Sequence, residues 1–201
     1  MSSKGLLLVV SGASGVGKGT VMKELFAMRD DLYMSVSATT RKPREGEVDG
    51  VHYHFISKEE FADIKRNDGF LENATFCDNS YGTLKSEVFE RLEKGINVVL
   101  EIEVQGALQV RSEYPEGVFI YIAPPSFSEL EARLVGRATE EAEVIEKRLE
   151  TARWEMTQIN KYNYVIINDE VKKAAERISA CIDAEHVRIE RCYNDIKEKL
   201  K

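Results

Sequence analysis

The chain has 201 residues, with 28 lysines and arginines against 35 aspartates and glutamates, so its formal net charge at pH 7 is −7. This length suits one domain with a substantial core. The acidic balance argues against nonspecific binding to nucleic acid or to an anionic membrane surface. The N-terminal apolar run is too short to span a membrane and lacks a signal-peptide cleavage pattern, so we expect a cytoplasmic protein.

The first predicted strand, Leu6–Val10, runs into the glycine-rich loop SGASGVGKGT of residues 11–20 and then into a predicted helix. Glycines allow backbone N–H groups to turn inward around an anion, and the helix that follows adds its positive N-terminal end. The Lys18 ammonium can reach the outer phosphates of a nucleoside triphosphate. The stretch therefore predicts a P-loop formed by Gly12, Ala13, Ser14, Gly15, Val16, Gly17, Lys18, Gly19 and Thr20.

The alternative is a chance glycine-rich turn between a buried strand and a helix. The context argues against it, because a strand precedes the loop and apolar residues follow at helical spacing, at Val21, Leu25 and Met28. One residue departs from the strict pattern: Gly19 stands where a serine or threonine hydroxyl usually binds magnesium. We therefore expect Mg²⁺ to be held mainly by phosphates, water and an acidic residue elsewhere.

Further strands and helices alternate along the chain. Strands are predicted at Tyr33–Val36, Val51–Phe55, Asn97–Ile102, Val118–Ile122 and Tyr164–Ile167. Helices are predicted from Ser57, whose spacing to Glu60 makes a capping box, from Lys85 to Glu93 with Gly95 as its stop, from Ser126 with Glu129, from about Glu140 to Asn160, and from about Val171 to Lys199.

This alternation favours an α/β fold of the P-loop NTPase type: a doubly wound, three-layer parallel sheet. The runs beginning at Leu6, Asn97, Val118 and Tyr164 are nearly continuous apolar stretches, as in strands covered on both faces. Residues 37–84 have fewer such runs and more charged turns. They are interpreted as an insertion at the carboxyl edge of the sheet, where ligands bind in such folds.

The three cysteines are predicted to be free thiols. Cys181 and Cys192 fall within the one predicted C-terminal helix, where eleven residues span roughly 16 Å, beyond the reach of a disulfide. Free thiols are typical of a reducing compartment.

The inserted segment contains a second group of candidate binding residues. Arg41 and Arg44 flank Pro43, and two guanidinium groups held close together suit a phosphate, which accepts bidentate hydrogen bonds. For an arbitrary arginine pair, a solvated basic turn would be the better interpretation. Here the phenols of Tyr53 and Tyr81 can donate to the same phosphate. Glu72 lies between these tyrosines in the sequence, and Thr83 follows Tyr81.

At this point the chain resembles the guanylate kinase family, and the resemblance extends over essentially all 201 residues. It is carried by the P-loop and by the stretches SATTRKPREGE at 37–47, GVHYHF at 50–55, FLENA at 70–74, SYGT at 80–83, EIEVQG at 101–106, IAPPS at 122–126 and VIIND at 165–169. The family transfers the terminal phosphate of ATP to GMP. The resemblance implies the same reaction here, with dGMP as a further acceptor, and a helical lid over an inserted GMP-binding region.

The implied regions are a core at about 1–36, 96–125 and 161–201, a GMP-binding region at about 37–84 and a lid at about 126–160. By resemblance, the GMP phosphate is bound by Arg41, Arg44, Tyr53 and Tyr81, and the guanine base by Ser37, Glu72 and Thr83, the last of which is often serine in the family. Guanine chemistry agrees independently, because one carboxylate can accept from both N1–H and the exocyclic amino group. Adenine offers no such pair of donors, so an unpaired buried Glu72 would reject it.

Glu101 and Glu103 alternate at the end of a predicted strand, so both are expected on one face at the edge of the sheet. The resemblance implies that Glu101 holds Mg²⁺ through water and that Glu103 contacts the GMP or orients an arginine. Many family members have aspartates here, and the longer side chains leave the alternative of a solvated acidic strand end, above all for Glu103.

Arg133 and Arg137 are four residues apart on one predicted helical face, and Arg148 follows on the next helix. An exposed helix commonly carries arginines. The resemblance instead assigns them to the lid, with Arg137 near the adenine and with Arg133 and Arg148 at the transferred phosphoryl group. The expected catalytic residues are thus Lys18, Arg41, Arg133 and Arg148. Asn168 is implied at the adenine, although a helix-capping role for Asn168 or Asp169 is equally physical.

Three other functions fit the sequence less well. A kinase of another nucleoside monophosphate, such as AMP, is disfavoured by Glu72 and Thr83. A P-loop GTPase lacks support because no Asn-Lys-x-Asp signature occurs. A non-catalytic binding module of the membrane-associated guanylate kinase type is disfavoured by the intact P-loop and the arginines. The expected partners are ATP and GMP or dGMP, with no nucleic acid and no membrane, and a homo-oligomer stays open.

Overall fold

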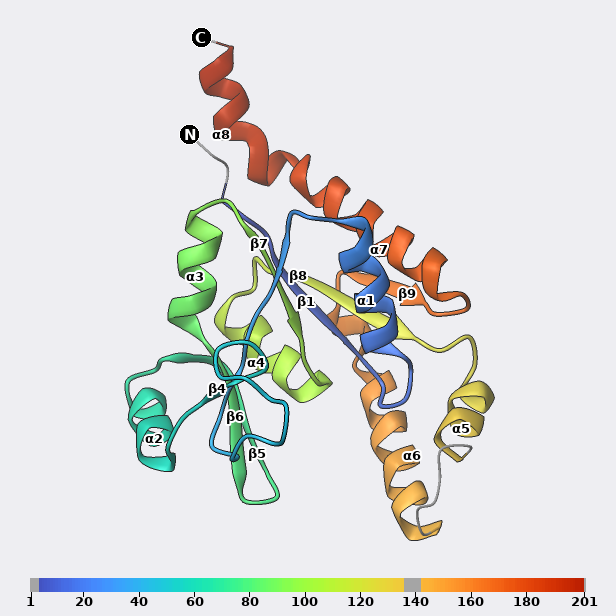
Figure 1. Ribbon diagram of the computed structural model, residues 1–201. Coiled ribbons are helices and arrows are strands. Elements are labelled where there is room, and N and C mark those ends of the chain that lie inside the picture. Colours follow the sequence, from blue (N-terminus) through green and yellow to red (C-terminus); the bar gives the residue numbers. More distant parts are fainter. Residues whose placement is uncertain (1–3, 136–141, 201) are drawn as a thin grey trace.

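The computed structural model describes residues 4–135 and 142–200. Within them, five strands form a parallel sheet in the order β2-β7-β1-β8-β9 (Figure 1). These strands are β1 (Leu7–Gly12), β2 (Leu32–Met34), β7 (Asn97–Glu101), β8 (Val118–Ala123) and β9 (Tyr164–Ile167). The predicted α/β fold with a parallel sheet is confirmed.

Helices cover both faces of this sheet. On one face, α1 (Lys18–Met28) and α7 (Val171–His186) pack side by side, and on the other lie α3 (Lys85–Glu93) and α4 (Val104–Glu113) (Figure 1). Successive strand residues alternate between the two cores: Leu8 and Val10 join the α1 and α7 side, and Val9 joins the α3 and α4 side. This alternation explains why β1 is apolar at consecutive positions.

A smaller four-stranded sheet is inserted between β2 and α3, in the order β4-β3-β6-β5. It comprises β3 (Ala38–Thr39), β4 (His54–Phe55), β5 (Phe70–Phe76) and β6 (Asn79–Leu84), and α2 (Lys58–Arg66) packs Phe61 against Phe70 beside it. The capping box of α2 is present as predicted. The strand predicted at Val51–Phe55 is wrong in extent, because only His54–Phe55 is a strand.

The hairpin of β5 and β6 was not predicted. Its two-residue turn, Cys77 and Asp78, has positive φ at both positions (46° and 62°), as the tight turns of hairpins require. A cysteine at such a position is unusual, so the sequence carried only a weak signal for this turn.

Two helices follow β8 and lie near the phosphate-loop end of the sheet: α5 (Phe127–Val135) and α6 (Ala142–Thr157), with the 3-10 turn η1 (Ile159–Lys161) after them (Figure 1). Ser126 begins α5 as predicted, its hydroxyl accepting from the Glu129 N–H at 3.2 Å. Leu134 of α5 and Leu149 of α6 are buried in the core shared with α1 and α7. The expected helix start near Glu140 lies outside the described residues.

The prediction of one helix over Val171–Lys199 is wrong, because the chain breaks into α7 and α8 (Ile189–Lys199). The buried carboxylate of Glu185 accepts from Arg188 (3.3 Å), Arg191 (3.1 Å) and the Tyr164 hydroxyl (2.7 Å). These contacts draw the chain around the Glu185 side chain, and Arg188 takes an extended conformation.

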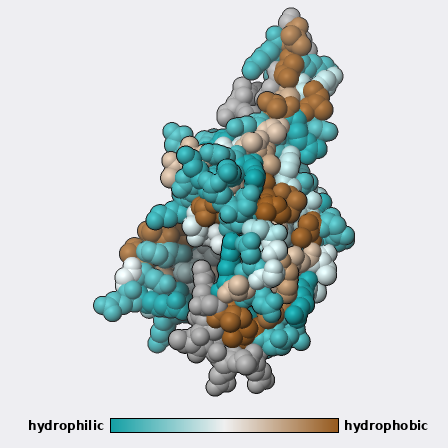
Figure 2. Space-filling view, turned by 90° about the vertical axis from the view of Figure 1, so that its right-hand side faces the viewer, coloured by the Kyte–Doolittle hydropathy of each residue, from teal (hydrophilic) through white to brown (hydrophobic). Residues whose placement is uncertain are grey.

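Helix α8 projects from the body of the protein and carries exposed apolar side chains (Figures 1 and 2). Cys181 and Cys192 consequently lie on different helices, and all three cysteines are free thiols. Among the helices of the described residues, none has the length and apolar character needed to cross a membrane.

Candidate nucleotide-binding site

The glycine-rich loop joins β1 to α1 and has the conformation expected of a phosphate-binding loop. Gly15 and Gly17 have φ values of 84° and 93°, in the region that favours glycine. A Cβ at Gly12 would lie 2.2 Å from the Ile122 carbonyl oxygen of the neighbouring strand. Helix α1 begins at Lys18 with no side-chain cap, so its first N–H groups remain available to an anion.

Lys18 contacts this loop, and the charges of three carboxylates act on it. Its Nζ donates a hydrogen bond to the Gly12 carbonyl oxygen at 2.7 Å. Burial lowers the pKa of Lys18, and the negative charges of Glu155, Glu101 and Glu103 act against that shift. A partly buried cation at the mouth of the loop is available to a phosphate, which would replace the carbonyl as its partner.

Glu155 was not predicted. It is 6% exposed, lies on α6 and accepts a hydrogen bond from the Ser14 backbone N–H at 3.2 Å. Arg148, two helical turns earlier, donates to the Ser14 hydroxyl at 3.4 Å. Burial raises the pKa of Glu155, while the Ser14 N–H and Lys18 oppose the rise. Helix α6 thus brings one expected arginine and one unexpected carboxylate onto the same loop residue.

The other side of the loop is held at the Val16 carbonyl oxygen. The Asn168 side-chain amide donates to it at 2.8 Å, and Arg133 of α5 approaches it at 3.4 Å. Asn168 is buried, directly after β9, and its backbone N–H donates to Ala123. The helix-capping alternative for Asn168 or Asp169 is wrong, because the N-cap of α7 is Glu170. Arg137 lies outside the described residues.

The carboxylate of Glu101, at the end of β7, lies over the start of α1. A Cβ on Gly19 would be 3.7 Å from its Oε1, so the carboxylate lies beside the position where the strict pattern has a hydroxyl. Loss of solvation raises the pKa of Glu101, and Lys18 opposes that rise. Within 4–135 and 142–200, no group of three or more His, Cys, Asp or Glu side chains could hold a metal ion. A single carboxylate fits Mg²⁺, which commonly takes one or two carboxylates along with phosphates and water.

The prediction that Glu101 and Glu103 share one face of a strand is wrong. Strand β7 ends at Glu101, and Glu103 is the N-cap residue of α4. Its negative charge is close enough to both Lys18 and Glu72 to raise the pKa of each.

A buried pair in the inserted sheet faces α4. Glu72 of β5 and Thr83 of β6 are paired across the hairpin, and the Thr83 hydroxyl donates to Glu72 Oε1 at 2.7 Å. They are 8% and 1% exposed. Burial raises the pKa of Glu72, and the hydrogen bond from Thr83 opposes this. A Cβ on Gly106 of α4 would come within 3.1 Å of Glu72 Oε2, so this glycine makes room for the carboxylate.

The structure also brings together three of the four predicted phosphate-binding side chains of the insertion, those of Arg41, Tyr53 and Tyr81. The Arg41 guanidinium lies 5.4 Å from the centre of the Tyr53 ring, which is 6.1 Å from that of Tyr81. Arg41 forms an ion pair with Glu47 at 2.9 Å, a partner that was not predicted. Arg44 is exposed in the same segment, and the carbonyl oxygen of Ser37 accepts from the His54 N–H.

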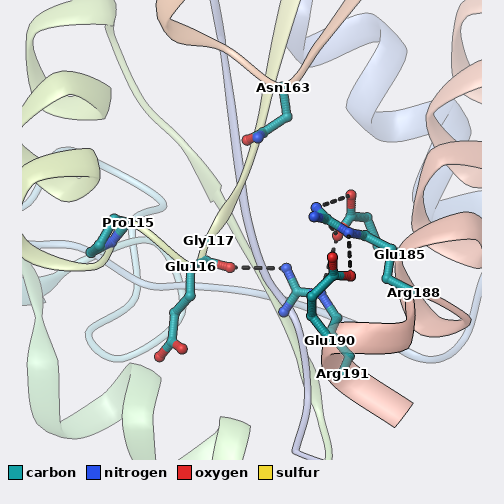
Figure 3. A pocket seen from close by; sticks show the side chains of 8 residues that line it. All are labelled: Pro115, Glu116, Gly117, Asn163, Glu185, Arg188, Glu190 and Arg191. Carbon is teal, nitrogen blue, oxygen red and sulfur yellow. Dashed lines mark hydrogen bonds and ion pairs between the residues drawn. The ribbon is translucent and has the colours of Figure 1, made fainter. Parts of the chain in front are cut away.

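A pocket of about 290 Å³ lies at the opposite end of the sheet, near the start of β8 and β9 (Figure 3). Its walls include the cluster of Glu185, Arg188 and Arg191 described above, in which the carboxylate is paired with both arginines. This pocket therefore belongs to the packing of α7 and α8 against the body.

A glycine-rich loop between the first strand of a parallel sheet and its helix, with a lysine at the helix start, defines a P-loop nucleotide-binding protein. Comparison with known proteins is more specific. The family model for guanylate kinase matches residues 4–185, and the chain belongs to the guanylate kinase family.

The relatives are similar over nearly their whole length. Guanylate kinase of Bacillus anthracis is 54% identical over 198 residues, which is 98% of this chain and 97% of that protein. Guanylate kinase of Streptococcus thermophilus (strain CNRZ 1066) is 55% identical over 201 residues, 100% of this chain and 96% of that protein. The crystal structure of guanylate kinase from Anaplasma phagocytophilum superposes with a TM-score of 0.73 at 32% identity, covering 94% of this chain and 90% of that one.

Proposed function

We propose that this protein transfers the γ-phosphate of ATP to GMP, giving ADP and GDP, and that dGMP is a further acceptor. The observation that carries the proposal is the presence of two unlike candidate sites in one fold. One is a phosphate loop with Lys18, and the other is the buried Glu72–Thr83 pair. The family membership of the whole chain supports the same reaction.

In the acceptor site, Glu72 accepts hydrogen bonds from guanine N1–H and the exocyclic amino group. Thr83 holds one carboxylate oxygen, and Ser37 and Glu103 complete the contacts to the nucleotide. The phosphate of GMP is bound by Arg41, Arg44, Tyr53 and Tyr81. The close approach of Arg41, Tyr53 and Tyr81 supports this assignment.

In the donor site, the loop of residues 12–20 binds the phosphates of ATP through its N–H groups and Lys18. Arg133 and Arg148 bind the transferred phosphoryl group. Both already lie against the loop, at the Val16 carbonyl oxygen and at the Ser14 hydroxyl. Arg137 and Asn168 are assigned to the adenine; for Asn168, the position directly after β9 supports this.

The reaction needs no covalent intermediate. A phosphate oxygen of GMP attacks the γ-phosphorus in line, and negative charge on the transferred group is offset by Lys18 and the two arginines. Bound Mg²⁺ supplies further charge neutralisation at the phosphates, and Glu101 is the residue that would hold it, through water. Arg41 and Arg44 position the attacking phosphate and reduce its repulsion from ATP.

The regions divide accordingly into a core at about 1–36, 96–125 and 161–201, a GMP-binding region at about 37–84 and a lid at about 126–160. Closure of the lid would exclude water, which would otherwise hydrolyse ATP. We further propose that the protein acts in the cytoplasm on these small nucleotides, without nucleic acid or membrane. A homo-oligomer is compatible with this function.

The test is a coupled assay of ADP formation with ATP and a panel of GMP, dGMP, AMP, CMP and UMP. Turnover with GMP and dGMP alone is the expected result. Preference for AMP would overturn the guanine assignment. Failure to bind ATP in a calorimeter, together with binding of phosphopeptides, would replace the enzyme by a binding module.

A further inference from the structure

Glu47 ends a tight turn that begins at Arg44. The Glu47 N–H donates to the Arg44 carbonyl oxygen at 3.0 Å, and Gly46 between them has a φ of 83°. The turn directs the Glu47 side chain back along the segment, where its Oε2 accepts the Arg44 N–H at 2.7 Å. The carboxylate is thereby fixed by the backbone of the segment that carries both acceptor-site arginines.

The same carboxylate holds the guanidinium of Arg41 by two parallel hydrogen bonds. Nη1 donates to Oε2 and Nη2 to Oε1, both at 2.9 Å, and a further Nη1 proton goes to the Lys42 carbonyl oxygen at 2.8 Å. The side chains of Arg41 and Glu47 are only 14% and 17% exposed. The rings of Tyr53 and Phe55, at 5.4 and 5.8 Å from the guanidinium carbon, enclose it further.

Glu47 and Lys42 engage only part of the Arg41 guanidinium. A guanidinium has five N–H groups, and Glu47 and Lys42 take both protons of Nη1 and one of Nη2. The remaining donors, Nε–H and the second Nη2 proton, lie along the other edge of the planar group. They form a second fork, which suits two oxygens of a phosphate. A guanidinium stays protonated in proteins, so this fork is charged. Hydrogen bonding and charge from Glu47 above all, and from Tyr81 more weakly, raise the pKa of Arg41, which places Tyr81 next to the same group.

We infer that Glu47 is a positioning residue for the acceptor phosphate: it binds one edge of Arg41 so that the Nε–Nη2 edge is presented to the phosphate of GMP. The inference rests on the proposed function. Glu47 orders the long side chain of Arg41 before GMP binds. Less of the free energy of GMP binding is therefore lost in ordering that side chain. A simple competitor for Arg41 would have the opposite effect on affinity.

The main experiment compares Glu47→Gln with Glu45→Gln. Glu45 is an exposed residue of the same segment and serves as the matched control. Calorimetry measures the dissociation constants of GMP and of guanosine, which lacks the phosphate. Glu47→Gln should weaken GMP binding about tenfold, the scale of losing an outer partner that orients a ligand-binding side chain. Guanosine binding and the KM for ATP should stay unchanged, and Glu45→Gln should match the unsubstituted protein.

A double-mutant cycle with Arg41→Ala shows whether Glu47 acts through that arginine. In the Arg41→Ala protein, Glu47→Gln should have little further effect on GMP affinity. The inference is overturned by tighter or unchanged GMP binding in Glu47→Gln, by an equal loss for guanosine, or by full additivity in the cycle. Glu47→Asp, which keeps the charge, should recover part of the affinity and guards against a folding defect. If the unsubstituted protein does not bind GMP, it is the proposed function that fails.

Discussion

Glu72→Gln is the most direct test of how the base is chosen. In the structure, Oε1 of Glu72 is engaged by the Thr83 hydroxyl and Oε2 lies beside Gly106. A glutamine has the same shape but one oxygen, no charge, and an NH₂ group that cannot accept from guanine. A hydrogen bond to a charged group contributes about 1.5–3 kcal/mol, and an unpaired buried donor costs about 1–3 kcal/mol.

Taking about 2–3 kcal/mol for the net loss, kcat/KM for GMP should fall roughly 30- to 150-fold. The assay is coupled ADP formation with GMP and with IMP, which lacks the exocyclic amino group. The preference for GMP over IMP should shrink toward unity in Glu72→Gln, whereas KM for ATP should not change. A variant that keeps the full preference would refute the assignment of guanine selection to Glu72.

The stability of the Glu72→Gln protein, relative to the unsubstituted protein, should also depend on pH. Burial raises the pKa of Glu72 above its ordinary value of 4.5, so the folded state favours the protonated carboxyl. The contribution of this group to folding is therefore fully present below pH 4.5 and is lost as the pH rises through the folded-state pKa. Thermal unfolding of the ligand-free protein should show Glu72→Gln gaining relative to the unsubstituted protein as the pH rises. The opposite trend, a relative loss with rising pH, would contradict the direction of the shift.

Three further substitutions test the donor side. Lys18→Met should reduce kcat by about 100-fold or more without lowering the melting temperature, since a partly buried charge is removed; a kcat within about tenfold of the unsubstituted protein would exclude the phosphate role. Gly17→Ala combines a φ of 93° with a Cβ 2.9 Å from the Asn168 amide, and should lose about 1–3 kcal/mol of stability as well as ATP affinity. Gly50→Ala, with a φ of 73° and no atom within 4 Å, is its control and should lose stability alone. Glu155→Gln should raise KM for ATP about fivefold, the scale of one weakened hydrogen bond, with GMP affinity unchanged; an equal change for both nucleotides would indicate a general structural role.

Much of the central architecture was predictable because its signals are local. The apolar run before the phosphate loop, the capping box at Ser57 and the stop at Gly95 each depend on residues a few positions apart. The break between α7 and α8 was missed for the opposite reason. It depends on Glu185, whose burial and contact with Tyr164 across 21 residues cannot be inferred from helical spacing.

In the candidate site, too, some features were predictable from local sequence and others depend on contacts between distant residues. From its sequence alone, this protein shows a phosphate loop and an arginine-rich inserted segment, because each is a short pattern of residue types with one chemistry. The prediction that Glu72 selects guanine came from the resemblance to the family. Only the tertiary structure shows that Glu155 holds Ser14 from 141 residues away and that Glu47 takes one edge of Arg41. It also brings the charge of Glu103 near both Lys18 and Glu72. The sequence alone does not distinguish one glutamate from another. The role of each glutamate depends on which donors the fold brings to its carboxylate oxygens and on how far the fold removes water from them.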